Sequence, residues 1–252
     1  MSIYFSGTLW VLGAAVISAV LVVITRRFGS EEVSEKNLGA GGSVFSIVAG
    51  LHAVLAAFIL ISLFDAANGA EEQVQKEANS LVAVNWASDS LPEPAKTKVD
   101  ELIRDYVTTV VHDEWPRMRD GESVDDEGWT RLNQIRDTIA AAAPDGDWQQ
   151  DRKAEAANQL WEVYQARQER LDAADNGVNP VVWLALLIGT GLSLLFPYLF
   201  RGPTLTSQLL ITITLTSTLV LLLFAIYQLQ NPFSGGVLIP SDAFSSALDR
   251  LS

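Results

Sequence analysis

One ionisable side chain stands in the middle of a long apolar stretch of this sequence. His52 lies within VFSIVAGLHAVLAAFILISLF (residues 44–64), which contains no Asp, Glu, Lys or Arg. An ionisable group at the centre of a membrane span is costly to bury, so it commonly serves a function there. His52 is therefore a candidate proton or ion relay or a pore-lining group. The alternative is a neutral imidazole that hydrogen-bonds across a helix interface.

A second candidate set lies in the last apolar run, which is rich in hydroxyl side chains. Gln208, Thr212 and Thr216 are spaced four residues apart and share one face of a helix. Hydroxyl and amide groups on one face can line a hydrated pore and replace part of an ion's water shell. Alternatively, each hydroxyl bonds to its own helix or holds neighbouring helices together.

Four carboxylates follow directly after the apolar run at residues 44–64. They are Asp65, Glu71, Glu72 and Glu77. If several copies of the chain surround an axis, these side chains form rings at an outer vestibule and concentrate cations. The alternative is an ordinary solvated helix face.

Other kinds of chemistry find little support in the residues. The chain has no cysteine, which excludes disulfides, thiolate metal sites and cysteine nucleophiles. The acidic loop at residues 120–128 lacks the ligand spacing of an EF-hand, and His112 lacks an H-E-x-x-H arrangement. No nucleophile elbow, phosphate-binding loop or dinucleotide fingerprint is present. We therefore expect no enzyme activity, no metal and no cofactor.

Four apolar runs are long enough to cross the ~30 Å hydrocarbon layer as helices. They cover residues 8–25, 44–64, 181–200 and 205–228. The first run is followed, not preceded, by basic residues, so it is expected to be a retained span and not a signal peptide. Within the second run, small side chains fall on one side, where another helix can approach: Ser46, Ala49, Gly50, Ala53 and Ala57.

Basic residues set the expected orientation of these spans. The short loops carry Arg26, Arg27, Lys36 and Arg201, and such loops usually face the cytoplasm. Both termini and residues 65–178 are then expected outside the cytoplasm, in a multi-pass protein of a bacterial plasma membrane.

The segment at residues 65–178 reads as four helices joined by turns at Leu91–Pro94, at the acidic loop and at Pro144–Asp147. It holds 25 Asp and Glu against 12 Lys and Arg, a difference of −13 that equals the net charge of the whole chain. Such a surface repels nucleic acid and gathers cations. Trp115–Pro116 is expected to end its second helix, and Trp161 is expected to face inward from its last helix.

The expected organisation is an all-α integral membrane protein with an extracytoplasmic four-helix domain between spans two and three. Residues 1–64 hold spans one and two with a short cytoplasmic loop, and residues 65–178 form the acidic domain. Residues 179–228 hold spans three and four. Residues 229–252 form an extracytoplasmic tail with a short amphipathic helix.

Several short motifs together resemble the bestrophin-like family of bacterial and plant membrane proteins, a domain of unknown function. They are Arg26-Arg27, GLHAVLAAFILISLFD (50–65), QKEANSL (75–81), Leu91-Pro92, DEWP (113–116) and NPFSG (231–235). The resemblance covers nearly the whole chain. It implies four spans with a helical domain between the second and third, and its name suggests ion conduction.

Two functions from different classes remain open at this point. The first is a homo-oligomeric ion channel in the lipid bilayer, with cations favoured because of the acidic domain and with span two or four lining the path. The second is a non-conducting scaffold, accessory subunit or envelope sensor whose outer domain binds a partner. The large outer domain and the amphipathic C-terminal helix motivate the second.

Overall fold

The computed structural model describes residues 3–28, 35–199, 204–236 and 238–251, and the regular elements in that part of the chain are all helical. The chain divides into two compact units. The membrane unit comprises Met1–Phe64 and Val178–Gln230, and the helical unit comprises Asp65–Gly177 and Asn231–Ser252. Helix α2 (Glu35–Ser88) contributes to both. Arg201, which was expected in a short cytoplasmic loop, lies outside the described residues.

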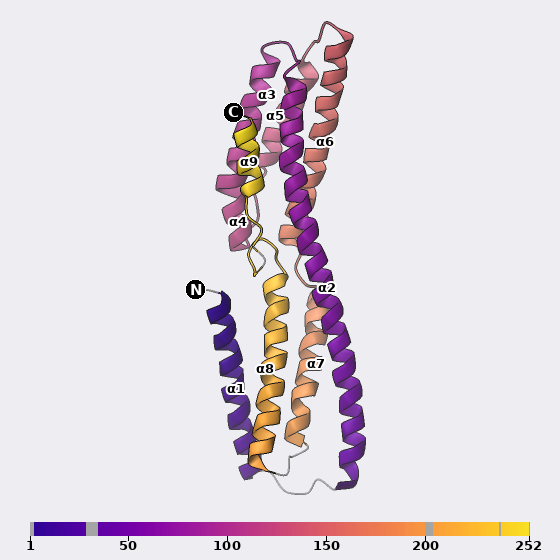
Figure 1. Ribbon diagram of the computed structural model, residues 1–252, viewed down its shortest axis with the longest axis vertical. Helices are drawn as coiled ribbons and strands as arrows, with labels where there is room; N and C mark the ends of the chain where they lie inside the picture. Colours follow the sequence, from indigo (N-terminus) through magenta and orange to yellow (C-terminus); the bar gives the residue numbers. More distant parts are fainter. Residues whose placement is uncertain (1–2, 29–34, 200–203, 237, 252) are drawn as a thin grey trace. The chain divides into compact units, whose positions relative to one another are not determined.

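The membrane unit contains α1 (Ile3–Phe28), the first part of α2, α7 (Pro180–Leu199) and α8 (Leu205–Leu229). Within this unit α8 lies between α1 and α7 (Figure 1), and α7 contacts α2 through stacking of Phe196 on Phe45, with ring centroids 4.2 Å apart. Each span is long and apolar enough to cross a membrane. Many of its large apolar side chains are exposed, as suits helices surrounded by lipid. The prediction of an all-α chain with four membrane-span helices is confirmed.

The second span starts earlier than expected. The apolar run begins at residue 44 and three glycines precede it at residues 39–42, yet α2 is already helical from Glu35. A glycine inside a helix costs only about 1 kcal/mol relative to alanine, so a long neighbouring apolar helix readily extends through a few of them.

The helical unit contains the second part of α2 together with α3 (Ala95–Thr109), η1 (Val110–Glu114), α4 (Trp115–Asp120), α5 (Glu127–Ala141), α6 (Asp147–Asp175) and α9 (Asp242–Arg250). Their apolar stripes meet in one core. Leu81, Ile103, Leu132 and Val163 come from four of these helices and are fully or almost fully buried there.

The second helix of this unit does not end at Trp115-Pro116 as expected. The chain instead passes through one π-helical turn, η1, into α4, which ends at Gly121 with a left-handed φ of 72°. Pro116 is tolerated because it stands in the first turn of α4, where its missing N–H matters least. The extra residue of the π turn also rotates the following side chains, so that both Glu114 and Trp115 point inward.

Two further expectations for this unit need correction. The C-terminal segment is not a separate tail, because Phe244 and Ala247 of α9 are buried in the core of the helical unit. Trp161 was expected to face inward, but it is 62% exposed, and the buried positions of α6 around it are Leu160 and Val163. On this part of α6 the core-facing positions are Leu160 and Val163, and Trp161 lies on the outward side.

Candidate functional site

His52 lies in the interior of the membrane unit. Its side chain is 5% exposed, and Nε2 is 3.2 Å from the hydroxyl of Thr190 on α7. The ring lies so close to Gly189 that a Cβ at that position would collide with Nδ1. His52 therefore joins α2 to α7 within one subunit, in the arrangement that the interhelical alternative describes.

The hydroxyl-rich face of α8 also points into the subunit. Gln208, Thr212 and Thr216 are each almost completely buried. The Gln208 amide donates to the Pro197 carbonyl at 2.9 Å, and its Oε1 accepts from Arg26 Nε at 2.9 Å. A pore between subunits is lined by side chains that are exposed on the isolated subunit, so these three residues and His52 do not face such a pore.

The four carboxylates after the second span have different surroundings. Asp65, Glu71 and Glu72 are exposed on α2, as a vestibule requires. Glu77 is fully buried in the helical unit, where Arg170 Nε donates to it at 2.7 Å. The expectation that Glu77 lies in an outer vestibule is therefore corrected, because its charge is neutralised inside the subunit.

Exposed side chains form a regular line along α2. The line runs through residues that are alternately four and three apart: Ile47, Leu51, Val54, Phe58, Ile61, Asp65, Asn68, Glu72, Gln75 and Asn79, all exposed. We call it the α2 stripe. Its part in the membrane unit is wholly apolar, and its part in the helical unit is wholly polar. This spacing averages 3.5 residues, the repeat by which helices pack around a common axis.

Small residues lie beside the apolar part of the α2 stripe. Ser46, Gly50, Ala53 and Ala57 are exposed, whereas Ala49 is partly covered. A Cβ added to Gly50 would meet no atom within 4 Å. The face that was expected to admit another helix is thus uncovered within the described part of this chain.

A network of buried charges occupies the centre of the helical unit. Arg167 and Arg170 of α6 are fully buried, as is Glu77 of α2, and Glu114 of η1 is 3% exposed. Arg167 makes a two-pronged contact with Glu114 at 2.7 and 2.8 Å. Arg170 bridges both carboxylates, since its Nη2 also lies 3.0 Å from Glu114. Tyr106 of α3 donates to Glu77.

Aromatic rings surround the two guanidinium groups. Arg167 lies 4.7 Å from the ring centroid of Trp129, and Arg170 lies 5.5 Å from that of Trp115. Gly128 packs against the charged groups so tightly that a Cβ there would collide with Glu114 and Arg167. Because two positive and two negative charges are paired and mostly hydrogen-bonded, the network ties α2, α3, η1 and α6 together.

Burial and charge pairing determine the ionisation states of Glu114 and Tyr106 in this network. Burial alone would raise the pKa of Glu114, but hydrogen bonds and charges from Arg167 and Arg170 more than offset it, so that its pKa lies below the ordinary value. Burial raises the pKa of Tyr106 well above its ordinary value, and the neighbouring Glu77 raises it further. The carboxylate of Glu114 is thus charged and the phenol of Tyr106 is neutral near pH 7.

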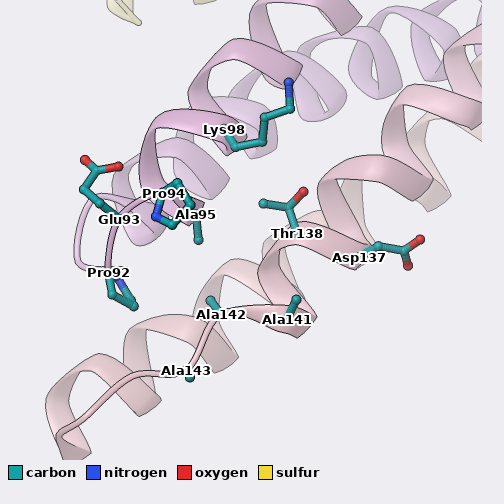
Figure 2. A pocket seen from close by; sticks show the side chains of 10 residues that line it. All are labelled: Pro92, Glu93, Pro94, Ala95, Lys98, Asp137, Thr138, Ala141, Ala142 and Ala143. Carbon is teal, nitrogen blue, oxygen red and sulfur yellow. The ribbon is translucent and has the colours of Figure 1, made fainter.

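A groove at one end of the helical unit offers a different kind of surface. It has a volume of about 610 Å³ and lies between the turn before α3 and the end of α5. Figure 2 shows two prolines and four alanines in its lining, together with Glu93 and Lys98. Among the described residues no group of three His, Cys, Asp or Glu side chains is placed to hold a metal ion.

Comparison with known proteins identifies the family. Residues 12–244 match the model of the Bestrophin-like domain family. The chain belongs to this family. A crystal structure of a variant of a bacterial bestrophin homologue from Klebsiella pneumoniae is similar over 100% of this chain and 98% of its own, with a TM-score of 0.70 and 14% identity.

Another crystal structure, of a membrane protein, has a TM-score of 0.71 at 12% identity and covers 96% of this chain and 97% of its own. At these identities the structural neighbours establish the shared fold. No curated protein sequence matches the chain.

Three of the motifs that suggested the bestrophin-like family meet in the helical unit. QKEANSL (75–81) supplies Glu77, and DEWP (113–116) supplies Glu114 and Trp115. NPFSG (231–235) supplies Phe233, whose ring meets Trp115 edge-on with centroids 5.6 Å apart. The partners of these residues on α6, Arg167 and Arg170, were missed because α6 carries many charges and its pattern does not mark these two as inward-facing.

Proposed function

We propose that this chain is one subunit of a homo-oligomeric ion channel in which α2 lines the water path. Membership of the Bestrophin-like family and similarity to a bacterial bestrophin homologue support a channel. The observation that carries the assignment of α2 is its stripe, which stays exposed at 3.5-residue spacing over both units. The exposed small residues beside it leave room for a neighbouring α2.

The side chains of the α2 stripe change once along its length, from apolar to polar. From Ile47 to Ile61 the path is apolar, and such a constriction passes ions only when it is hydrated. From Asp65 to Asn79 it carries carboxylates at two levels, Asp65 and Glu72, separated by two helical turns. No basic residue lies on the stripe, and Lys76 nearby is paired with Glu162 at 2.5 Å.

This arrangement favours cations. In an oligomer each carboxylate level becomes a ring of negative charge, which raises the local concentration of cations. By the positive-inside rule these rings lie on the outer side of a bacterial plasma membrane, since Arg26 and Arg27 follow the first span. Asp65 and Glu72, with Glu71 beside them, form the vestibule in this proposal.

Cysteine accessibility tests the path directly, because the chain has no cysteine of its own. Val54→Cys, Asp65→Cys and Glu72→Cys are reconstituted in planar bilayers and treated with a charged thiol reagent. We expect modification to block most of the current. Val16→Cys on α1, also exposed, is the control that faces lipid and should leave the current unchanged. Unaltered current after complete labelling of all three stripe positions contradicts the proposal.

Ion preference is tested with charge-neutralising variants. Asp65→Asn combined with Glu72→Gln should lower the cation-to-anion permeability ratio several-fold, measured as a shift of reversal potential in a salt gradient. Asp151→Asn, an exposed carboxylate on α6, is the matched control. An unchanged reversal potential would be consistent with a channel but would contradict the proposed vestibule of Asp65 and Glu72.

The alternative is a non-conducting membrane protein whose helical domain binds a partner. The C-terminal helix does not support this alternative, because the apolar face of α9 is buried within the helical unit. Exposed tryptophans still favour it, since Trp148 and Trp161 are 69% and 62% exposed on α6. Purified protein that assembles but passes no current, and that co-purifies with a defined partner lost on Trp161→Ala, would support this alternative.

A further inference from the structure

Buried hydroxyl groups of α7 and α8 occupy successive levels inside the membrane unit. The two helices run antiparallel, and the bond from Gln208 to the Pro197 carbonyl fixes their register. Counting turns along each helix from that bond, we infer that Ser193 falls at the level of Thr212 and Thr190 at the level of Thr216, and we call these four residues the column. These four side chains are each at most 6% exposed. His52 joins the column at Thr190.

Three of these hydroxyls have no hydrogen-bond partner among the described residues. They are Ser193 Oγ, Thr212 Oγ1 and Thr216 Oγ1. Threonines elsewhere in the spans behave differently, because Thr8, Thr25 and Thr218 donate to the carbonyl four residues earlier. Thr212 and Thr216 make no such bond within the described residues, although both side chains are buried inside the membrane unit. A buried hydroxyl without a partner is unfavourable, and three in one column are strongly so.

The two ends of the column differ. At one end Gln208 is bonded to Arg26, a partly exposed side chain in the last turn of α1. Beyond Thr190 and Thr216 the interior becomes apolar, with Leu186, Leu219 and Ile226 closing it. The column is therefore polar from the Arg26 end as far as His52 and apolar after it.

We infer that this column binds ordered water molecules inside each subunit, in contact with the solution at the Arg26 end and ending at His52. Water supplies both a donor and an acceptor to each hydroxyl, which no group in the described part of the chain does. Because the column is closed at one end, it is a site and not a second ion path. It lies inside the subunit, so it does not depend on the proposed path along α2.

The sign of a stability change tests the inference. Thr212→Val and Thr216→Val remove a hydroxyl at nearly constant shape, and each melting temperature is measured in lipid nanodiscs. If water is bound, each variant loses a bridged bond, and we expect a fall of about 2–4 °C. Thr218→Val, whose hydroxyl is exposed and bonded to its own helix, is the control and should shift less. Thr216→Ser, which keeps a hydroxyl, should restore most of the loss.

A dry column gives the opposite sign. Removing an unpaired hydroxyl then relieves its cost, so a rise in melting temperature for both valine variants overturns the inference. If either variant fails to fold, a high-resolution image of the wild-type protein in nanodiscs decides. Water density between Thr212 and Ser193 supports the inference, and its absence in a map that resolves water in the helical unit rejects it.

Discussion

The two units of this chain bury polar groups in opposite ways. The helical unit buries full charges, and it pairs Glu77 and Glu114 with Arg167 and Arg170 through several hydrogen bonds. The membrane unit buries neutral hydroxyls, an amide and an imidazole, and three of the hydroxyls have no partner among the residues that the structure describes. Buried charges thus fix the packing of the helical unit, whereas in the membrane unit Gln208 and His52 join helices and the three hydroxyls are left for the water that we infer.

The contrast has a physical origin in the two surroundings. A charge in the core of a water-soluble domain is tolerated once it is paired, since burial of the pair is compensated by short charge-assisted bonds. A charge between membrane spans is far more costly, so neutral groups take its place. Even in the helical unit the pairing is incomplete, because Arg167 Nε has no partner among the described groups.

Breaking the charge network should give the largest effect. Arg170→Met removes the guanidinium that bridges Glu77 and Glu114 and leaves buried negative charge without compensation. We expect the free energy of unfolding to fall by about 3–5 kcal/mol, measured by chemical denaturation in detergent. Arg152→Met, at a partly exposed position on α6, is the control and should change it by less than about 1 kcal/mol. Equal effects of the two variants would contradict a structural role for the network.

Acid should lower the stability of the helical unit, because protonation removes the charge of Glu114 from the network. The pKa of Glu114 is lower in the folded protein than its ordinary value of 4.5, so the folded state favours the charged carboxylate. Its stabilising contribution is therefore present above pH 4.5 and is lost as the pH falls through the folded pKa. We expect the melting temperature to decline below pH 4.5, measured by calorimetry between pH 7 and pH 3. A Glu114→Gln variant should begin less stable and show a shallower decline, and a decline identical to that of the wild type would argue against Glu114 as its source.

Two glycine-to-alanine variants compare how each unit tolerates a Cβ added against buried polar side chains. In Gly128→Ala the new Cβ collides with Glu114 and Arg167, and in Gly189→Ala it collides with His52. Both should destabilise by about 1–3 kcal/mol. Gly128→Ala should cost more, because it displaces paired charges, whereas the His52 ring can move against neutral neighbours. Thermal unfolding measures both, with Gly191→Ala, whose Cβ meets nothing within 4 Å, as the reference. A larger loss of stability for Gly189→Ala than for Gly128→Ala would contradict this expectation.

Sequence patterns predicted the helices better than they predicted the sites. Apolar runs without charge identified the four spans, and the pattern of residues 65–178 predicted a helical domain, whose core includes Val99, Ile103 and Tyr106. The family motifs pointed to the correct family, which the comparison confirms. Glu77 could not be distinguished from Glu72 in this way, because both are carboxylates on the same polar stretch of one helix.

The sequence by itself determined that the chain is helical and enters a membrane, since uncharged apolar runs of this length are unstable in water. Composition also located the excess negative charge in residues 65–178. The tertiary structure alone decided which polar residues face inward. The face that a side chain occupies depends on helix register, and here one π turn at Val110–Glu114 brought Glu114 to Arg167 and Arg170. Packing likewise turned Gln208, Thr212 and Thr216 into the subunit and left the α2 stripe exposed.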